Sequence, residues 1–232
     1  MWFSALIECR LSGKAARCRS LAALLMASAI PVSEAAAYGQ ADSKSETLRI
    51  PAGQPVVVDG VLGDAEWKRS AEAVIDAGPD WKILVRGKHD AKNLYLVFTG
   101  VKHGEQRLFP EVLVDTTSRR PRKWEPGVFW FHLSNTLCEG DGEHDVYQHN
   151  GVFQCTHTKP GWDGNNSPAK DSDVVEVRIS FDKLRIAYHS GLKLGLSLEV
   201  TNASGDASQT WSFWLRSATL NDPSTWALVV LE

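Results

Sequence analysis

The chain has 232 residues, of which 43% are hydrophobic and 23% are charged, with 18 Gly and 10 Pro. These proportions are typical of a globular protein and exclude a disordered or collagen-like chain. The 25 basic and 28 acidic side chains give a formal net charge of −3. Because nucleic-acid binding needs a basic excess, we expect no nucleic-acid partner.

The first 37 residues have the layout of a secretory signal peptide. Four basic residues precede an apolar run from Ser20 to Val32, and small residues follow it up to Ala37. A run of 13 residues is too short for a helix that spans about 30 Å of hydrocarbon. It is also not periodic, which disfavours the alternative of a buried amphipathic helix. We expect cleavage after Ala37, a secreted or periplasmic protein, and no transmembrane span in the mature chain.

Residues 38–46 are small and polar and predict a flexible tether, which one domain over residues 47–232 follows. A short helix is expected at Gly63–Ser70, with Asp64 as its N-cap and Trp67 as its anchor. The remaining segments are short, rich in Val, Leu and aromatic residues, and bounded by turn formers, which indicates strands. The expected strands are 81–89, 93–101, 109–116, 127–134, 151–157, 173–181, 192–201, 209–216 and 226–232.

Alternation within these segments predicts which side chains face a core. In 173–181 the apolar residues Val175, Val177, Ile179 and Phe181 fall on one face. About nine strands with one short helix predict an all-β domain, and a two-sheet antiparallel β-sandwich of immunoglobulin-like or jelly-roll type buries such surfaces most simply. A β-barrel is the alternative.

Cys138 and Cys155 are the two cysteines that follow residue 37. In an oxidising compartment an even pair predicts a disulfide, which would stabilise the fold by about 3 kcal/mol in the chain-entropy model. Two buried free thiols, or a metal site with nearby histidines, are the alternatives.

The segment 138–163 is also the richest in metal-ligating side chains. Histidines could bind zinc or copper there, and carboxylates could bind calcium, although no spacing matches a standard closed site. We expect no required cofactor, with calcium as the candidate structural ion and a polar loop as the competing interpretation. The histidines are His144, His149 and His157, and the carboxylates are Asp141, Glu143 and Asp145.

The sequence contains no G-x-S-x-G, H-E-x-x-H, C-x-x-C or Gly-rich phosphate-loop motif. Its acidic pairs, such as Asp141 with Glu143, stand in turn-rich segments where solvated carboxylates are common. We therefore expect that the protein is not an enzyme.

Tryptophan is more informative, because eight of the nine follow residue 37 and several stand beside polar or turn residues. An indole stacks on the apolar face of a sugar ring, while amide, carboxylate and guanidinium groups bind its hydroxyls. Core packing is the competing interpretation, and we prefer it for Trp67, Trp81, Trp211 and Trp226. The predicted ligand-binding residues are Trp124, Trp130, Trp162, Trp214, Arg178, Arg216, Asn165 and Asn202.

Five segments from residue 55 to residue 232 follow a familiar order. They are PVVVDGVLGDAEWKRSA, KNLYLVFTGV, EVLVDT, VVEVRISFDKL and WSFWLRSATLNDPSTWALVVLE. In sequence and spacing they resemble the family 9 carbohydrate-binding modules and their DOMON-like relatives. The resemblance implies a β-sandwich that binds sugars or the chain ends of polysaccharides, often with structural calcium.

The resemblance also shows where this chain departs from the family. In the sugar-binding members two tryptophans clamp the sugar, and the matching positions here are Glu105 with its neighbours and Leu220, neither of them aromatic. The stacking residues must therefore lie elsewhere. Haem-binding relatives commonly ligate iron with Met and His, yet no Met follows residue 37, which leaves a bis-His or a Lys and His site through His103, His132 or His149.

The expected function is non-catalytic recognition of a saccharide. The alternatives are a protein-interaction or structural module of the cell envelope without a sugar site, and a metal- or haem-binding DOMON-like domain. Nothing in the sequence identifies a protein partner or chooses among sugars, since one fold serves several functions.

Overall fold

A computed structural model of the protein describes residues 47–134, 136–142, 154–156, 161–165, 173–202 and 210–232, with the side chains of 154–156 excepted. The expected signal peptide and tether lie outside the described residues, as does residue 135. The strands are β1 (Thr47–Ile50), β2 (Ala71–Gly78), β3 (Trp81–His89), β4 (Asn93–Thr99), β5 (Lys102–His103), β6 (Gln106–Arg107), β7 (Phe109–Asp115), β8 (Val128–Leu133), β9 (Leu137–Asp141), β10 (Gln154–Thr156), β11 (Trp162–Asn165), β12 (Val174–Ser180), β13 (Lys193–Thr201), β14 (Trp211–Trp214) and β15 (Ala227–Leu231).

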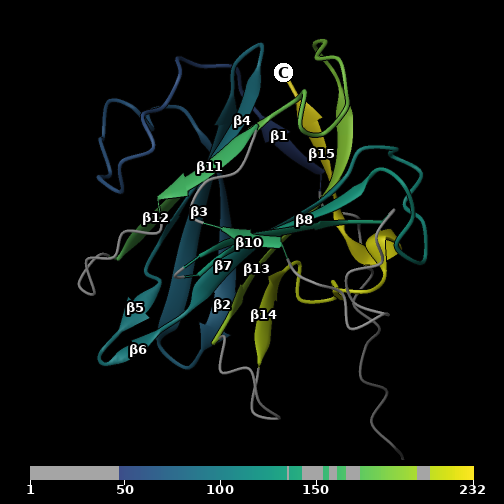
Figure 1. Ribbon diagram of the computed structural model, residues 1–232. Helices are drawn as coiled ribbons and strands as arrows, with labels where there is room; N and C mark the ends of the chain where they lie inside the picture. The colour runs from purple at the N-terminus through teal and green to yellow at the C-terminus, as the bar shows by residue number, and fades with distance from the viewer. Residues whose placement is uncertain (1–46, 135, 143–153, 157–160, 166–172, 203–209) are drawn as a thin grey trace, which may run out of the picture. The chain divides into compact units, whose positions relative to one another are not determined.

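Two sheets form the domain, which confirms the expected sandwich (Figure 1). The larger sheet has eight strands in the order β1-β15-β13-β7-β8-β9-β10, with β14 also paired to β13. The smaller sheet has five strands in the order β11-β12-β4-β3-β2, and β5 with β6 forms a separate hairpin. All pairs are antiparallel except β1 with β15, which is parallel and departs from the expected all-antiparallel pattern.

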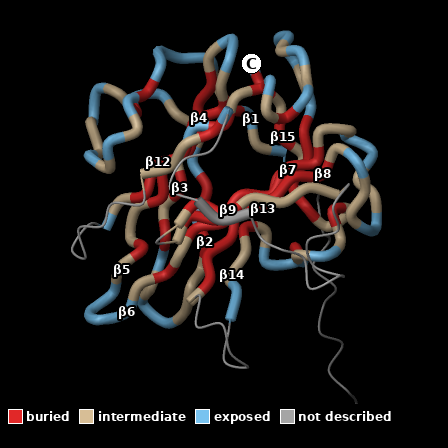
Figure 2. The backbone as a smooth tube through the Cα atoms, in the orientation of Figure 1, coloured by how far each residue is buried: buried red, intermediate tan, exposed pale blue. Residues whose placement is uncertain are grey.

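A single apolar core lies between the two sheets. The smaller sheet contributes Ile83, Val85 and Phe98, among others, while the larger contributes Phe131 and Leu198 with their neighbours. The alternating residues of β12 that were expected to face inward, from Val175 to Ile179, are buried there. Burial therefore follows the strands, and exposure is concentrated in the connecting loops (Figure 2).

The helix expected at Gly63–Ser70 is wrong, because this segment is a chain of turns. The backbone N–H of Trp67 donates to the Gly63 carbonyl at 3.1 Å, which closes one turn, and Arg69 then takes a positive φ of 62°. Eight residues give too few hydrogen bonds to offset the cost of helix nucleation. Among the described residues the helical element is a short 3₁₀ turn at Pro223–Thr225, with Asp222 as its N-cap.

The role expected for Trp67 as an anchor is correct. Its ring is buried against the outer face of the smaller sheet with Val56, Tyr95 and Val97, and its indole Nε1 donates to Glu176 at 3.0 Å. The other Glu176 oxygen accepts the backbone N–H groups of residues 59 and 60 at 3.0 and 2.9 Å. Burial raises the pKa of the Glu176 carboxyl, and these three hydrogen bonds oppose that shift.

We predict that Trp67→Phe lowers the free energy of unfolding by about 1–3 kcal/mol, because it removes a donor from a buried carboxylate while keeping the ring. Urea unfolding measures the change. The matched control is Val57→Ala in the same segment, since Val57 is 67% exposed and should change the stability by less than about 0.5 kcal/mol. Equal stability of the two variants would show that the Glu176 contacts do not hold this segment.

Candidate functional site

A row of side chains crosses the outer face of the larger sheet. The register pairs Phe213 of β14 with Glu199, Glu199 with Glu111, Glu111 with His132, and His132 with Cys138. Residues directly opposite in neighbouring strands point to the same face of a sheet. Because Leu198 and Val200 of β13 face the core, Glu199 and the rest of this row point away from it.

Glu111 and Glu199 form a buried pair of carboxyl groups in this row. Glu111 accepts a hydrogen bond from Trp130 Nε1 at 2.7 Å and contacts His132 Nδ1 at 2.8 Å. Apart from a hydrogen bond with the Glu111 carboxyl group, neither oxygen of Glu199 has a partner among the described residues. Burial, and then the adjacent Glu111 carboxylate, raise the pKa of Glu199 well above its usual value.

Aromatic rings surround the carboxyl pair. The rings of Trp130 and His132 are stacked with centroids 5.5 Å apart at 22°, and the Phe109 ring lies 6.5 Å from His132. Trp211 is paired with Thr201, two positions along the strand from Glu199 and on the same face. Its ring is 38% exposed, whereas the carboxyl pair is buried. Trp211 therefore marks the place where this face reaches the surface.

The other end of the same face is closed by two loops. Loop 116–127 carries Trp124, whose indole Nε1 donates to the Leu220 carbonyl at 3.1 Å. The Trp124 ring meets Trp226 edge-on at 6.3 Å and 81°. Leu220 is thus contacted by a tryptophan from a distant segment.

Three of the four tryptophans predicted to stack on a sugar are buried, so the structure corrects that expectation. Trp162 is only 2% exposed and its Nε1 donates to Glu139 at 2.5 Å, because β11 pairs with β12 and places Trp162 opposite inward-facing Ile179. Trp214 faces the core opposite Leu198, and Trp130 packs among the residues of the outer face. Trp124 is half-buried.

Trp211 was expected in the core and is instead exposed. The signal that could have found it is the spacing, since Trp211 and Trp214 are three residues apart in one strand and so lie on opposite faces. If Trp214 enters the core, Trp211 must point outward. Glu111 and Glu199 were also missed, because a single carboxylate in an apolar strand gives no sign of the residue it will face across the sheet.

The predicted polar partners do not meet in one place. Arg178 lies on the outer face of the smaller sheet, 3.8 Å from Asp163, and Asn165 lies on that face beside Gly60. Asn202 follows β13, and Arg216 follows β14 and binds Asp76. The four residues therefore fall into two pairs. Arg178 and Asn165 share the outer face of the smaller sheet, and Asn202 and Arg216 share a different region of the surface.

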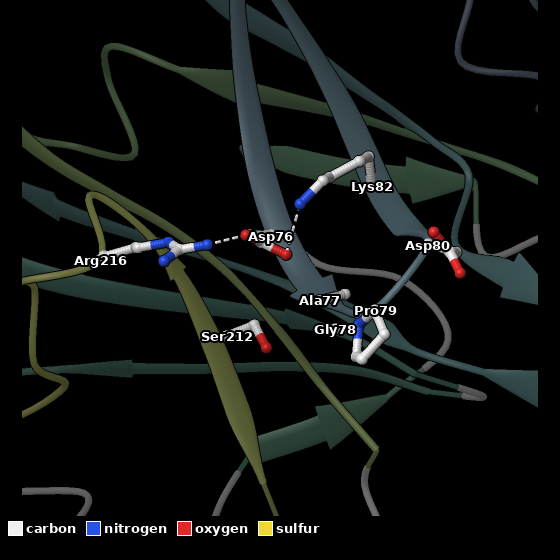
Figure 3. A pocket seen from close by; sticks show the side chains of 8 residues that line it. All are labelled: Asp76, Ala77, Gly78, Pro79, Asp80, Lys82, Ser212 and Arg216. Carbon is white, nitrogen blue, oxygen red and sulfur yellow. Dashed lines mark hydrogen bonds and ion pairs between the residues drawn. The ribbon is translucent and has the colours of Figure 1, made fainter.

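That region is a cleft beside the β2–β3 turn, made of two hollows that share residues 77–79 and Ser212. One has a volume of about 790 Å³ and is lined by Asp76, Lys82 and Arg216 (Figure 3). The other, of about 540 Å³, is lined by Trp81, His103, Arg107 and Asn202, among others. Figure 3 shows Lys82 and Arg216 converging on the Asp76 carboxylate from opposite sides.

The predicted metal ligands are tested only in part. Asp141 lies 3.7 Å from Arg185, and the remaining candidates lie outside the described residues, namely Glu143, Asp145, His144, His149 and His157. No cluster of three or more His, Cys, Asp or Glu side chains that could hold a metal ion occurs in the described ranges.

The predicted disulfide stays a prediction, although the backbone favours it. The register places Cys155 of β10 directly opposite Cys138 of β9, and the side chain of Cys155 is outside the described set. Within the part of the chain that the structure covers, no helix is long and apolar enough to cross a membrane.

Comparisons with known proteins bear on the fold. No family model matches the sequence, and no curated protein matches it. Two solved structures of a family 9 carbohydrate-binding module from Caldicellulosiruptor kristjanssonii, one with cellotriose and one with glucose, are similar to this chain with a TM-score of 0.53 and 15% identity. The match covers 81% of this chain and 94% or 96% of theirs. The resemblance seen in the sequence is therefore confirmed for the fold, which is a β-sandwich like that of family 9 carbohydrate-binding modules.

Proposed function

We propose that the domain binds carbohydrate without converting it, at the outer face of the larger sheet. The observation that carries the proposal is the Glu111–Glu199 pair, in which neither Glu199 oxygen has a hydrogen-bond partner other than Glu111 among the described residues. A buried carboxyl group with unmet hydrogen-bonding capacity costs about 1–3 kcal/mol. A ligand rich in hydroxyl groups can meet that capacity.

The surroundings of the pair suit a sugar in particular. Sugar hydroxyls donate to carboxylate oxygens, and the C–H faces of a pyranose pack on aromatic rings. Trp211 supplies an exposed ring on the same face, and Phe213 stands between Trp211 and the loops at the other end. Because Glu111 and Glu199 are buried, a saccharide can reach them only if the side chains packed around the pair move aside. The similar structures that hold glucose and cellotriose support this class of ligand and a non-catalytic role.

One observation favours a second candidate function. Trp130, Trp162 and Trp214 are buried, so three of the rings expected to bind sugar are not accessible. This favours a protein-interaction or structural module of the envelope, which has no sugar site. The two functions differ in their response to soluble sugars, so the titration below separates them.

The location of the protein is a further part of the proposal. We infer that the leader over residues 1–37 directs export and that Cys138 and Cys155 are then oxidised to a disulfide. The support is the layout of the leader and the cross-strand register of the two cysteines.

We predict that glucose or cellotriose shifts the intrinsic tryptophan fluorescence of the protein, and that Glu199→Met weakens the binding about tenfold or more because two acceptor oxygens are lost. Trp211→Ala should weaken it as well. Arg178→Gln, on the opposite sheet, is the control and should bind as the unmodified protein does. The proposal fails if a panel of soluble saccharides produces no shift, and an unchanged affinity of Glu199→Met would refute the assigned site.

The same Glu199→Met variant should be more stable without ligand, by about 1–3 kcal/mol at neutral pH, because an unsatisfied carboxyl group is replaced by an apolar side chain of similar size. In the unmodified protein the folded state holds the Glu199 proton to higher pH than the unfolded chain does. The free energy of unfolding should therefore fall as the pH rises from about 4, the usual pKa of the unfolded carboxyl, toward the raised folded value.

Urea unfolding at several pH values measures this dependence, and Glu199→Met should reduce its slope over that range. An unchanged slope in the variant would show that Glu199 does not hold a proton in the folded protein.

When the full chain is expressed with an export system, we predict that the mature protein begins at Tyr38 and shows no reactive thiol under denaturation until it is reduced. N-terminal sequencing and thiol titration measure the two outcomes. A protein that keeps residues 1–37, or two reactive thiols in unreduced exported protein, would contradict the corresponding part of the proposal.

A further inference from the structure

The cleft beside the β2–β3 turn is separate from the carboxyl pair. Its smaller hollow is bounded by the β2–β3 turn, the β5–β6 hairpin, and the residues that follow β13 and precede β14. Val200 and Ser212, which line it, alternate along their strands with Glu199 and Phe213. The hollow therefore opens on the side of the larger sheet opposite the carboxyl pair, and its volume of about 540 Å³ is within the usual range for small-ligand pockets.

Aromatic rings form one wall of this hollow. Trp81 is held in place by its indole Nε1, which donates to the Gly100 carbonyl at 2.7 Å. The imidazole of His103, from the β5–β6 hairpin, is stacked on Trp81 with ring centroids 5.3 Å apart at 29°. His103 is exposed, so the stacked pair presents a flat surface to the solvent side of the hollow.

A guanidinium and several neutral polar groups also line this hollow. Arg107 is half-buried in the wall, and burial lowers its pKa while the charge of Asp173 opposes that shift. Asn202 and Thr210 hold each other through two hydrogen bonds, from Thr210 N to Asn202 Oδ1 at 3.1 Å and from Asn202 N to the Thr210 carbonyl at 3.4 Å. The side-chain amide of Asn202 is thus fixed in a hollow that also contains a partly desolvated cation.

The adjoining hollow is lined by two cations and two anions and so adds no net charge. Lys82 lies 2.6 Å from Asp76, and Arg216 binds the other oxygen of the same carboxylate, so two cations share one anion. With Arg107 and Asp80 included, the ionised side chains that line the two hollows carry one net positive charge. The whole chain has a formal net charge of −3, so the positive charge of the cleft is a local feature.

We propose that this cleft is a second binding site, selective for an acidic saccharide that carries a carboxylate, of the uronic-acid type. The carboxylate pairs with the Arg107 guanidinium, whose planar donors fit a carboxylate. The sugar ring packs on the Trp81–His103 stack, and its hydroxyls bind the polar groups around Asn202 and Ser212. The site is independent of the one proposed on the outer face.

Binding of digalacturonic acid and of its methyl ester tests the proposal, because the ester keeps every hydroxyl and loses only the charge. By isothermal titration the acid should bind at least about tenfold more tightly than the ester, and its affinity should fall as salt is added. Arg107→Gln should remove that preference, and Arg107→Lys should retain part of it. In NMR spectra the acid should shift the indole N–H signal of Trp81 and the imidazole signals of His103.

Two further variants separate the possible failures. His103→Ala should weaken binding of the acid. Because His103 is exposed, this variant should fold, and it therefore tests the proposal even if Arg107→Gln does not fold. Glu199→Met should bind the acid as the unmodified protein does, even if glucose and cellotriose fail to bind anywhere. Equal binding of acid and ester, no effect of either cleft variant, or shifts at Trp211 in place of Trp81 would overturn the proposal.

Discussion

The apolar layer between the two sheets is the constraint on which the rest of the structure depends. Once Leu198 and Val200 of β13 enter that layer, the period of two along a strand sends Glu199 to the other face. Glu111 and His132 in the neighbouring strands lie on that face as well, since directly opposed residues share a face. A shift of one residue in the register would bury these polar groups in the core and expose the apolar ones, so packing alone specifies the polar row.

Glu176 and Glu199 are both buried, but they differ in how their carboxyl oxygens are hydrogen-bonded. Glu176 accepts three hydrogen bonds, from two backbone N–H groups and the Trp67 indole, and so ties segment 57–70 to the smaller sheet. Glu199 is equally buried, yet apart from Glu111 no donor meets either of its oxygens within the described parts of the chain. The first arrangement stabilises the fold, because its polar atoms are satisfied. The second destabilises the free protein, and a cost of that kind is expected at sites that a ligand completes.

Much of the architecture could be predicted because it depends on local alternation. All nine expected segments contain a strand. The strand at 81–89 has the expected bounds, and the others are shorter than expected by one residue or more. The strands that were missed are β1, β2, β5, β6 and β11. Four of them carry little local signal, since β1 has four residues, β5 and β6 have two each, and β11 reads as a Gly and Asn turn until it pairs with β12. The eight residues of β2 (AEAVIDAG) do alternate, but they are rich in Ala and acidic residues, which are depleted in strands. The prediction of a helix at Gly63–Ser70 was wrong although local signals were present, because a capping residue and an aromatic anchor are also compatible with a series of turns.

The site was less predictable than the fold because it depends on pairing between distant segments. Glu111 and Glu199 are separated by 88 positions, and no local pattern indicates that they meet. Exposure of a tryptophan is likewise set by its strand's register, which is why Trp162 in a turn-like sequence is buried and Trp211 in a strand is exposed. Composition led to the hypothesis that indole rings and polar groups bind a sugar, but it could not say which rings are accessible.

The difference from the family at the clamp positions can be explained by the same reasoning. In the site that we propose, an aromatic ring must have a particular position in the folded domain, and any segment of the chain that reaches that position can supply it. Trp124 reaches over Leu220 from loop 116–127 and is held there by a hydrogen bond to the Leu220 carbonyl. On the other side of Glu199, Trp211 supplies an exposed ring from β14. At 15% identity the sandwich is kept because many apolar residues fill its core equally well, whereas the loops that surround its outer face are not held by that core and can differ.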